Sequence, residues 1–181
     1  MATWKIDPKH SDVKFKVRHL VVSTVTGHFN TFDATVESEK DDFTDARVSF
    51  EADIDSISTK DPQRDGHLKS ADFFDAANHP KMTFVSKSIT RKSRSEYELV
   101  GDLTIRGNTK EVVLAIEYNG TVKGFGGVET AGFEIKGKVN RFDFGLHWNA
   151  LTEAGGIVVG DEVKIEIEAE LNKVEQARKA A

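Results

Sequence analysis

Residues 163–171 read VKIEIEAEL, a stretch in which apolar and charged side chains alternate without a break. Successive residues of a β-strand point to opposite faces of a sheet, so this stretch predicts a strand with one dry and one wet face. The same alternation recurs in residues 13–19, 48–54 and 97–105, where only Val100 interrupts it. Strict alternation of this kind is typical of antiparallel strands that cover a core on one side.

Further strands are expected in five segments, near residues 2–6, 28–37, 81–91, 112–116 and 127–144, which brings the total to about eight or nine. Turn sequences separate several of these segments, for example Arg106-Gly107-Asn108 and Asn119-Gly120. A closed barrel is the simplest way to bury every dry face and to leave no sheet edge exposed. The predicted fold class is therefore all-β, a single antiparallel β-barrel.

One segment, residues 61–76, departs from the β pattern. Asp61 followed by Pro62 is typical of a helix N-cap and first helical residue, and it predicts a short helix through residues 63–68. A second helical turn is expected at residues 71–74. A single helical insertion of this kind commonly closes one end of a barrel.

The chain has 181 residues, enough for one domain with a sizeable core. We expect the barrel to occupy residues 1–173 and to leave residues 174–181 as a C-terminal tail without an assigned role. The 25 Lys and Arg residues against 30 Asp and Glu residues give a net charge of -5, and the two signs are interspersed. Nucleic acids and anionic membranes are bound by clustered positive charge, so neither is an expected partner.

The composition also argues against an enzyme. The chain has no cysteine, which excludes disulfide scaffolds, thiolate metal sites and cysteine nucleophiles. Its six histidines lie at no recognised metal-binding spacing, and no nucleophile elbow, phosphate-binding loop or dinucleotide fingerprint is present. We therefore expect no catalytic residues, no cofactor and no metal.

No apolar run approaches the length needed to span a membrane. The first expected strand begins almost at the start of the chain, at Thr3, which leaves no room for an export signal. The expected location is the cytoplasm.

Two polar residues fall on the predicted dry face. Parity within residues 131–141 places Arg141 on the same side as Phe133 and Ile135, and parity within residues 13–19 places His19 on the apolar side. An ionised group inside a barrel must be paired or hydrogen-bonded. Polar groups within an otherwise apolar wall predict a cavity for an amphiphile, with one polar end.

Many inward positions carry small side chains: Ala34, Ala46, Ala52, Gly101, Ala131, Gly137 and Ala169. A barrel of about eight strands is either just filled by its own side chains or holds one small ligand. Small inward residues favour a ligand, but the alternative is that the glycines mark bulges and the alanines face large partners. Both interpretations stay open on the pattern alone.

A series of short motifs follows in order along the chain: Trp4-Lys5-Ile6-Asp7 with His10-Ser11, Arg18-His19-Leu20, Gly27-His28-Phe29, Ser56-Ile57-Ser58-Thr59, Arg64-Asp65-Gly66-His67-Leu68, Asp72-Phe73-Phe74, Gly101-Asp102-Leu103-Thr104-Ile105-Arg106-Gly107 and Asn140-Arg141-Phe142-Asp143-Phe144-Gly145. Together they resemble the YceI-like, polyisoprenoid-binding family across nearly the whole chain. The resemblance implies a lipocalin-like barrel around a hydrophobic tunnel that holds a long isoprenoid or similar lipid. It also implies no catalytic machinery and frequent pairing into homodimers.

For such a lipid, Arg141 and Arg64 are candidates to bind a phosphate or a quinone carbonyl, and His19 and His67 to donate one hydrogen bond each. The expected apolar wall consists of Phe15, Val17, Phe32, Phe50, Phe84, Leu103, Ile105, Leu114, Phe133 and Ile165, with Phe73 and Phe74 at the barrel end.

Each polar candidate also has a structural interpretation. Arg141 can pair with a buried acid such as Asp65, His19 can be a core histidine bonded to backbone, and Arg64 and His67 can be solvated helix residues. The favoured function is a non-catalytic lipid carrier or store. The alternatives are an enzyme that uses His19 or His67 on an amphiphilic lipid, and a filled barrel that binds a protein partner.

Overall fold

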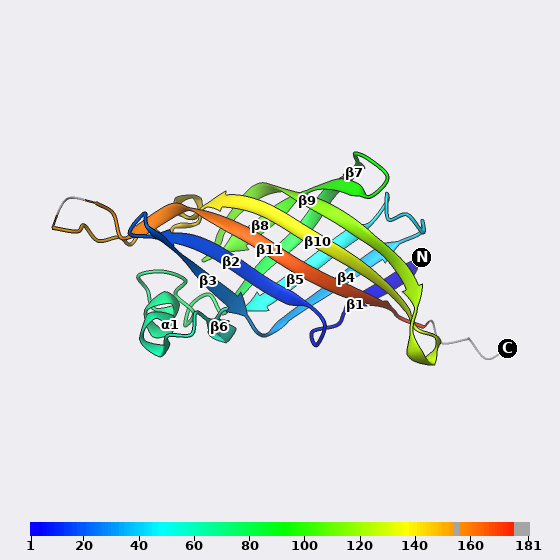
Figure 1. Ribbon diagram of the computed structural model, residues 1–181, viewed down its shortest axis with the longest axis horizontal. Coiled ribbons are helices and arrows are strands. Elements are labelled where there is room, and N and C mark those ends of the chain that lie inside the picture. The colour runs from blue at the N-terminus through cyan, green and yellow to red at the C-terminus, as the bar shows by residue number, and fades with distance from the viewer. Residues whose placement is uncertain (154–155, 176–181) are drawn as a thin grey trace.

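The computed structural model describes residues 1–153 and 156–175 of the chain. The strands of this part form one antiparallel sheet that is rolled into an elongated barrel (Figure 1). Their bounds are β1 Ala2–Ile6, β2 Asp12–His19, β3 Ser23–Phe29, β4 Phe32–Ser38, β5 Arg47–Asp53, β6 Ile57–Ser58, β7 Lys81–Arg91, β8 Glu96–Ile105, β9 Asn108–Lys123, β10 Glu129–Asn140 and β11 Val159–Lys173.

The barrel closes because β11 pairs on both of its edges. One edge pairs with β10, and the other pairs first with β2, through Ile165 opposite Phe15, and then with β1, through Leu171 opposite Ile6. The closed ring β1-β4-β5-β7-β8-β9-β10-β11 has eight strands. Strands β2, β3 and β6 continue β1, β4 and β5 past short interruptions. The predicted antiparallel barrel of about eight strands is confirmed.

Two local predictions about strands and turns are wrong. Residues 28–37 are not one strand, because Asn30 and Thr31 lie outside the strands and separate β3 from β4. Asn119-Gly120 is not a turn but lies inside β9, where a bulge beside Gly132 absorbs the glycine with its φ of 107°. The turn at Arg106-Gly107 is confirmed, with φ values of 49° and 71°.

Strand β10 ends earlier than expected. It stops at Asn140, whose side-chain oxygen accepts a hydrogen bond from the Phe142 N–H and so starts a 3-10 turn over Arg141–Phe144. The prediction that strand parity carries Arg141 into the interior is therefore wrong. It is the first residue of this turn and is nevertheless buried, with 4% of its surface exposed.

The helical insertion is confirmed in its first half. Helix α1 spans Pro62–Lys69, and the Asp61 side chain accepts hydrogen bonds from the backbone N–H groups of Gln63 and Arg64. Residues 71–74 form turns rather than a second helical turn. Helix α1 lies beside β6 at one end of the barrel, with β1 at the other (Figure 1). Within the described residues, no helix combines the length and the apolar character needed to cross a membrane.

Strand β11 ends at Lys173. Of the predicted tail 174–181, Val174 donates a backbone hydrogen bond to the Thr3 carbonyl in β1. Residues 176–181 lie outside the described residues.

An aromatic cluster closes the barrel end away from α1. Phe43, in the loop between β4 and β5, is buried and packs with its ring centroid 5.2 Å from those of Trp4 and Phe133 and 5.5 Å from that of Tyr118. The Tyr97 hydroxyl donates a 2.6 Å hydrogen bond to a backbone carbonyl of the same loop. The loop is therefore held over this end by both ring packing and a hydrogen bond.

Neighbouring side chains occupy the space in front of two inward glycines. A Cβ added at Gly101 would lie 2.4 Å from the Phe84 ring and 2.5 Å from the Val85 carbonyl oxygen, and one at Gly137 would lie 2.5 Å from Leu114. Gly101 pairs with Ser86 at the register shift between Ser86 and Ser88, as the bulge interpretation expects, whereas Gly137 pairs with Ile165 in unbroken register and instead makes room for Leu114. Other small inward residues do line the cavity described below, namely Ala34, Ala46 and Ala169.

We expect Gly101→Ala to destabilise the protein by about 1–3 kcal/mol, because the Val85 backbone cannot move away from the new methyl group. Gly66→Ala is the matched control. Gly66 lies within α1 with open space around it, so alanine should stabilise the fold by about 0.5–1 kcal/mol. Urea unfolding measures both. Equal effects of the two substitutions would contradict the close packing at Gly101.

The β4–β5 loop contains a carboxylate that is held in its ionised form. Asp45 accepts hydrogen bonds from the Ser38 hydroxyl at 2.6 Å and from the backbone N–H groups of Glu39 and Lys40. The Ser38 hydrogen bond, together with these backbone donors, lowers the pKa of Asp45 from 3.8 to about 2.

Because this pKa is lowered in the folded state, the stabilisation is complete above the unfolded value of 3.8 and is lost as pH falls towards about 2. We expect a carboxyl NMR titration to place the Asp45 midpoint near 2, and Ser38→Ala to move it up towards 3.8. An unshifted midpoint in the wild-type protein would refute this account of the loop.

Candidate functional site

The described strands surround a cavity of about 640 Å³. Its size falls within the usual range for small-molecule sites, which is about 300–1,000 Å³. Apolar side chains from nearly all of the long strands form its wall, including Val36, Phe50, Leu99, Ile116, Val139 and Val163.

The cavity reaches the surface at the α1 end. Among its described lining residues, Arg18 of β2 and Gln63 of α1 are the exposed ones. The polar lining residues Thr59, Asp61 and His19 lie at the same end, whereas buried Phe43 closes the other. The site is thus an apolar tunnel with one polar mouth, a geometry that suits an amphiphile.

Most of the candidate ligand-binding residues lie in the cavity wall, and their binding of a ligand stays a prediction. Phe15, Val17, Phe50, Phe73, Phe74, Phe84, Leu103, Ile105, Leu114, Phe133, Ile165, His19, Arg64, His67 and Arg141 all line the cavity. Phe32 does not. It is half-buried at the start of β4. Its ring packs against two core clusters, one around Trp4 and one around Phe29, and not against the cavity.

The Arg141 side chain donates hydrogen bonds to backbone carbonyls between β10 and β11 and at the start of β11. Its Nε donates to Gly160 O at 2.8 Å, Nη1 donates to Leu146 O at 2.6 Å and Trp148 O at 2.8 Å, and Nη2 donates to Val159 O at 3.3 Å. Burial lowers the pKa of Arg141. Arginine has five N–H donors, so one is left and a two-pronged grip on a phosphate would break an existing bond.

The proposed pairing of Arg141 with a buried acid such as Asp65 is wrong. Asp65 instead accepts hydrogen bonds from the backbone N–H and the hydroxyl of Thr59, at 2.8 and 2.6 Å. Backbone carbonyls, not a carboxylate, satisfy the Arg141 charge.

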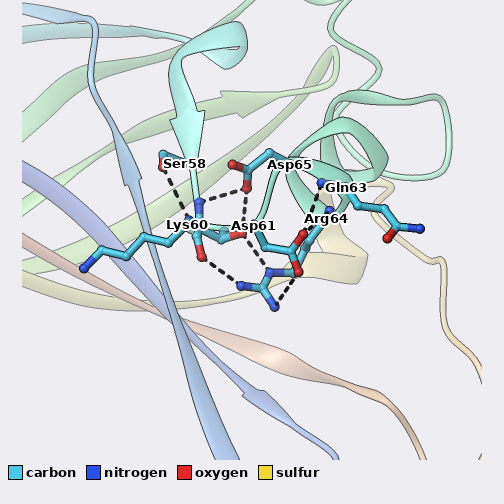
Figure 2. A network of polar contacts seen from close by, with 7 residues as sticks. Ser58, Lys60, Asp61, Gln63, Arg64 and Asp65 are labelled. Atoms are coloured by element: carbon cyan, nitrogen blue, oxygen red, sulfur yellow. Dashed lines mark hydrogen bonds and ion pairs between the residues drawn. The ribbon is translucent and has the colours of Figure 1, made fainter.

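Arg64 takes part in the network that joins α1 to β6 (Figure 2). Its Nε donates to the Thr59 hydroxyl at 2.7 Å, its Nη2 donates to the Thr59 carbonyl at 2.8 Å, and its Nη1 lies 3.8 Å from the Asp61 carboxylate. Arg64 is therefore not a simple solvated helix residue. It lies at the mouth, and some of its N–H donors are already bonded to Thr59.

The two histidines at the mouth differ in their surroundings. His67 bonds through Nε2 to Asp72 at 2.8 Å and packs edge-on against Trp148, with ring centroids 4.6 Å apart. His19 is half-buried and lines the cavity, and within the described parts of the chain its ring has no hydrogen-bond or ion-pair partner. His19 is thus the histidine whose ring nitrogens are available to a ligand.

A possible metal-ligand group lies elsewhere. The ligand atoms of Asp7, His10 and Glu170 lie within 4.8 Å of one another, outside the cavity lining. The 2.8 Å contact between His10 Nδ1 and Asp7 raises the pKa of His10 and lowers that of Asp7, as expected for an ion pair. This pair accounts for the cluster without a metal.

The comparisons with known proteins agree with this geometry. Residues 4–171 match the model of the YceI-like domain. The chain belongs to the YceI-like domain family. It is 39% identical over 173 residues to UPF0312 proteins from Staphylococcus epidermidis and Staphylococcus aureus, with 95% of this chain and 98% of each relative covered.

Solved structures share this YceI-like fold. The YCEI protein of Campylobacter jejuni is 32% identical with a TM-score of 0.73, covering 87% of this chain and 90% of its own. BcnA of Burkholderia cenocepacia has a TM-score of 0.79 at 22% identity, covering 91% and 98%. A polyisoprenoid binding domain from Saccharophagus degradans has a TM-score of 0.67 at 12% identity, covering 94% and 98%. At these identities the last two likenesses concern the fold alone.

Several lining residues of this YceI-like barrel were missed by the sequence analysis, among them Trp148, Lys14 and Arg18. Trp148 lies in the segment before β11, where no periodic pattern indicates its direction. Lys14 and Arg18 of β2 have the parity of the wet face, yet they reach the mouth. Parity assigns a face of the sheet, but it does not show where a long side chain ends.

We expect Arg141→Met to destabilise the protein by about 2–4 kcal/mol, since it leaves buried carbonyls without donors. Arg141→Lys should restore only part of this loss, because one ammonium cannot reach carbonyls on both sides. Hydrogen exchange should speed up at the amides of Val158 and Val159 in both variants. Exposed Arg94→Met is the control, and a similar loss there would contradict the role of Arg141.

Proposed function

We propose that this protein binds one long-chain amphiphile, a polyisoprenoid, an isoprenoid quinone or a fatty-acid-like lipid, as a non-catalytic carrier or store. The tail lies in the barrel and the head group lies at the α1 mouth. The observation that carries the proposal is the apolar cavity of about 640 Å³ that ends in a single polar mouth. The name of the Saccharophagus degradans domain, which shares the fold, points to the same class of ligand.

The tail alone supplies enough affinity. Each methylene group removed from water contributes about 0.8 kcal/mol, so about ten buried groups contribute about 8 kcal/mol before the cost of immobilising the lipid. The wall reads length and hydrophobicity but not chemical identity, because apolar contact is non-directional. Selectivity among lipids therefore depends on the mouth.

The mouth favours a head group that accepts hydrogen bonds. The charged lining residues are Lys14, Arg18, Arg64 and Arg141 against Asp61 alone, in a chain whose net charge is -5. Because Arg141 and Arg64 are largely engaged with protein carbonyls and hydroxyls, Arg18 and His19 carry more of the recognition than the sequence suggested.

The alternatives receive less support. An enzyme that uses His19 or His67 is favoured by no specific observation, since the bond from His67 Nε2 to Asp72 orients the ring but identifies no reacting group beside it. A filled barrel that serves as a scaffold is at odds with the cavity volume. A cytoplasmic location and pairing into homodimers stay predictions.

Native mass spectrometry of the purified protein, followed by organic extraction, tests the proposal. We expect a stoichiometric adduct, or a one-to-one adduct after incubation with a long-chain prenol or ubiquinone. A clean mass that fails to shift with either compound would refute the carrier function. Chemical conversion of the bound lipid over time would instead favour the enzyme.

We expect Ile165→Trp to weaken binding of such a probe by at least about tenfold, because its larger side chain occupies the cavity that Ile165 lines. Lys164→Trp is the matched control, since Lys164, the residue before Ile165 in β11, is exposed. Fluorescence titration measures both affinities, and urea unfolding shows that both variants fold. Equal affinities would place the ligand outside the barrel.

A further inference from the structure

Exposed apolar side chains gather in two loops at the α1 end. Leu20, Val21 and Val22 form the tip of the β2–β3 hairpin, with Val21 63% and Val22 82% exposed. Leu151, which is 74% exposed, and Ile157 lie in the segment that leads into β11. We call these five residues the apolar rim.

The two halves of the rim are joined by backbone hydrogen bonds. Leu20 N–H donates to the Val158 carbonyl at 2.9 Å, and Leu151 forms an isolated β-bridge with Ile157. In Figure 1 the segment that enters β11, in orange, projects beyond the other strands at the end where α1 lies. The rim is therefore one connected surface at the tip of the molecule.

The hairpin tip adopts a backbone conformation that its residues disfavour. Leu20 and Val21 have φ values of 52° and 64°, a region in which Gly and Asn are usual and a β-branched residue is strained. The Arg18 Nη2 donates to the Val21 carbonyl at 3.0 Å and holds the turn. Valine here is unfavourable both for the backbone and for exposure to water, so the fold does not explain it, whereas an apolar contact does.

The rim is continuous with the mouth of the cavity. His19 directly precedes the hairpin tip and Val158 directly follows Ile157, and both residues line the cavity. A long lipid tail is costly to carry through water, so a carrier must open where its cargo resides. The neighbouring charges have both signs, as with Arg18 and Asp161, so attraction to an anionic surface is not what the rim provides.

We propose that the apolar rim inserts into the surface of a lipid bilayer and so places the cavity mouth against the membrane from which the cargo enters. This inference rests on the proposed function. It is an interfacial contact of side chains from loop tips, and its strength comes from burying apolar surface among the lipid chains.

Flotation with phosphatidylcholine vesicles that contain no probe tests the contact itself. The rim variant is Val22→Ser with Leu151→Ser, and the matched control is Val122→Ser with Phe125→Ser, which removes comparably exposed apolar residues from β9 and the turn at the opposite end. We expect the rim variant to reduce the vesicle-bound fraction roughly tenfold and the control to leave it unchanged. Wild-type protein that does not float, or an equal loss in both variants, would overturn the proposal.

A second measurement separates this proposal from the carrier function. A pyrene-labelled long-chain fatty acid is offered either in vesicle-free buffer or in the same vesicles. We expect the rim variant to bind the probe normally in buffer but to extract it from vesicles roughly tenfold more slowly. Failure of the wild-type protein to bind the probe in buffer argues against the carrier function, whereas flotation still decides on the rim.

Val21→Gly distinguishes a membrane contact from a structural role. Glycine relieves the positive φ, so we expect the melting temperature to rise while the vesicle-bound fraction falls. A purely structural role would move the two in the same direction. Concentration-dependent dimers that the rim variant abolishes, without flotation of the wild type, would show that the rim binds a second copy and would overturn the membrane contact.

Discussion

The closure of the sheet through β11 is the constraint on which the rest of this structure depends. Every long strand has one apolar face, and that face leaves water only if the sheet returns to its own first strand. Strand β11 achieves this by pairing with β2 along its first half and with β1 along its last residues. Because β2 and β1 follow one another along the 15 residues of β11, the barrel is elongated and encloses a tunnel.

A buried cation defines the mouth of that tunnel. Between the 3-10 turn that ends at Phe144 and the start of β11, the described residues form no further helix or strand, and the Arg141 guanidinium supplies donors to the carbonyls of Leu146 and Trp148. This arrangement is costly in desolvation, as the lowered pKa of Arg141 shows. What it provides is a fixed position for Trp148, which in turn packs against His67 of α1. Arg141 thus shapes the polar end mainly by holding the protein, not by facing a ligand.

The sequence predicted what depends on a repeating pattern, and it failed where a single residue meets a particular neighbourhood. Alternation located the strands and nearly all of the apolar wall, because parity is enforced by the pleat. It misplaced Phe32, which is the first residue of β4 after the interruption at Asn30 and Thr31. It also predicted a turn at Asn119-Gly120, where β9 instead has a bulge. Arg141 was correctly placed inside for the wrong reason, since a 3-10 turn and not the strand carries it there. Contacts between segments distant in sequence decide such cases, and no local pattern contains them.

The two ends of the barrel show how stability and function divide the molecule. At the closed end, Phe43 and its aromatic partners bury apolar surface and so stabilise the fold. At the open end, a strained valine turn and exposed aliphatic side chains do the opposite, since each raises the free energy of the isolated protein. Features that disfavour the folded monomer on its own are explained when their stabilising partner lies outside the chain. A lipid carrier has two such partners, the lipid inside the barrel and the bilayer surface from which the lipid is taken. Both partners meet the protein at the α1 end.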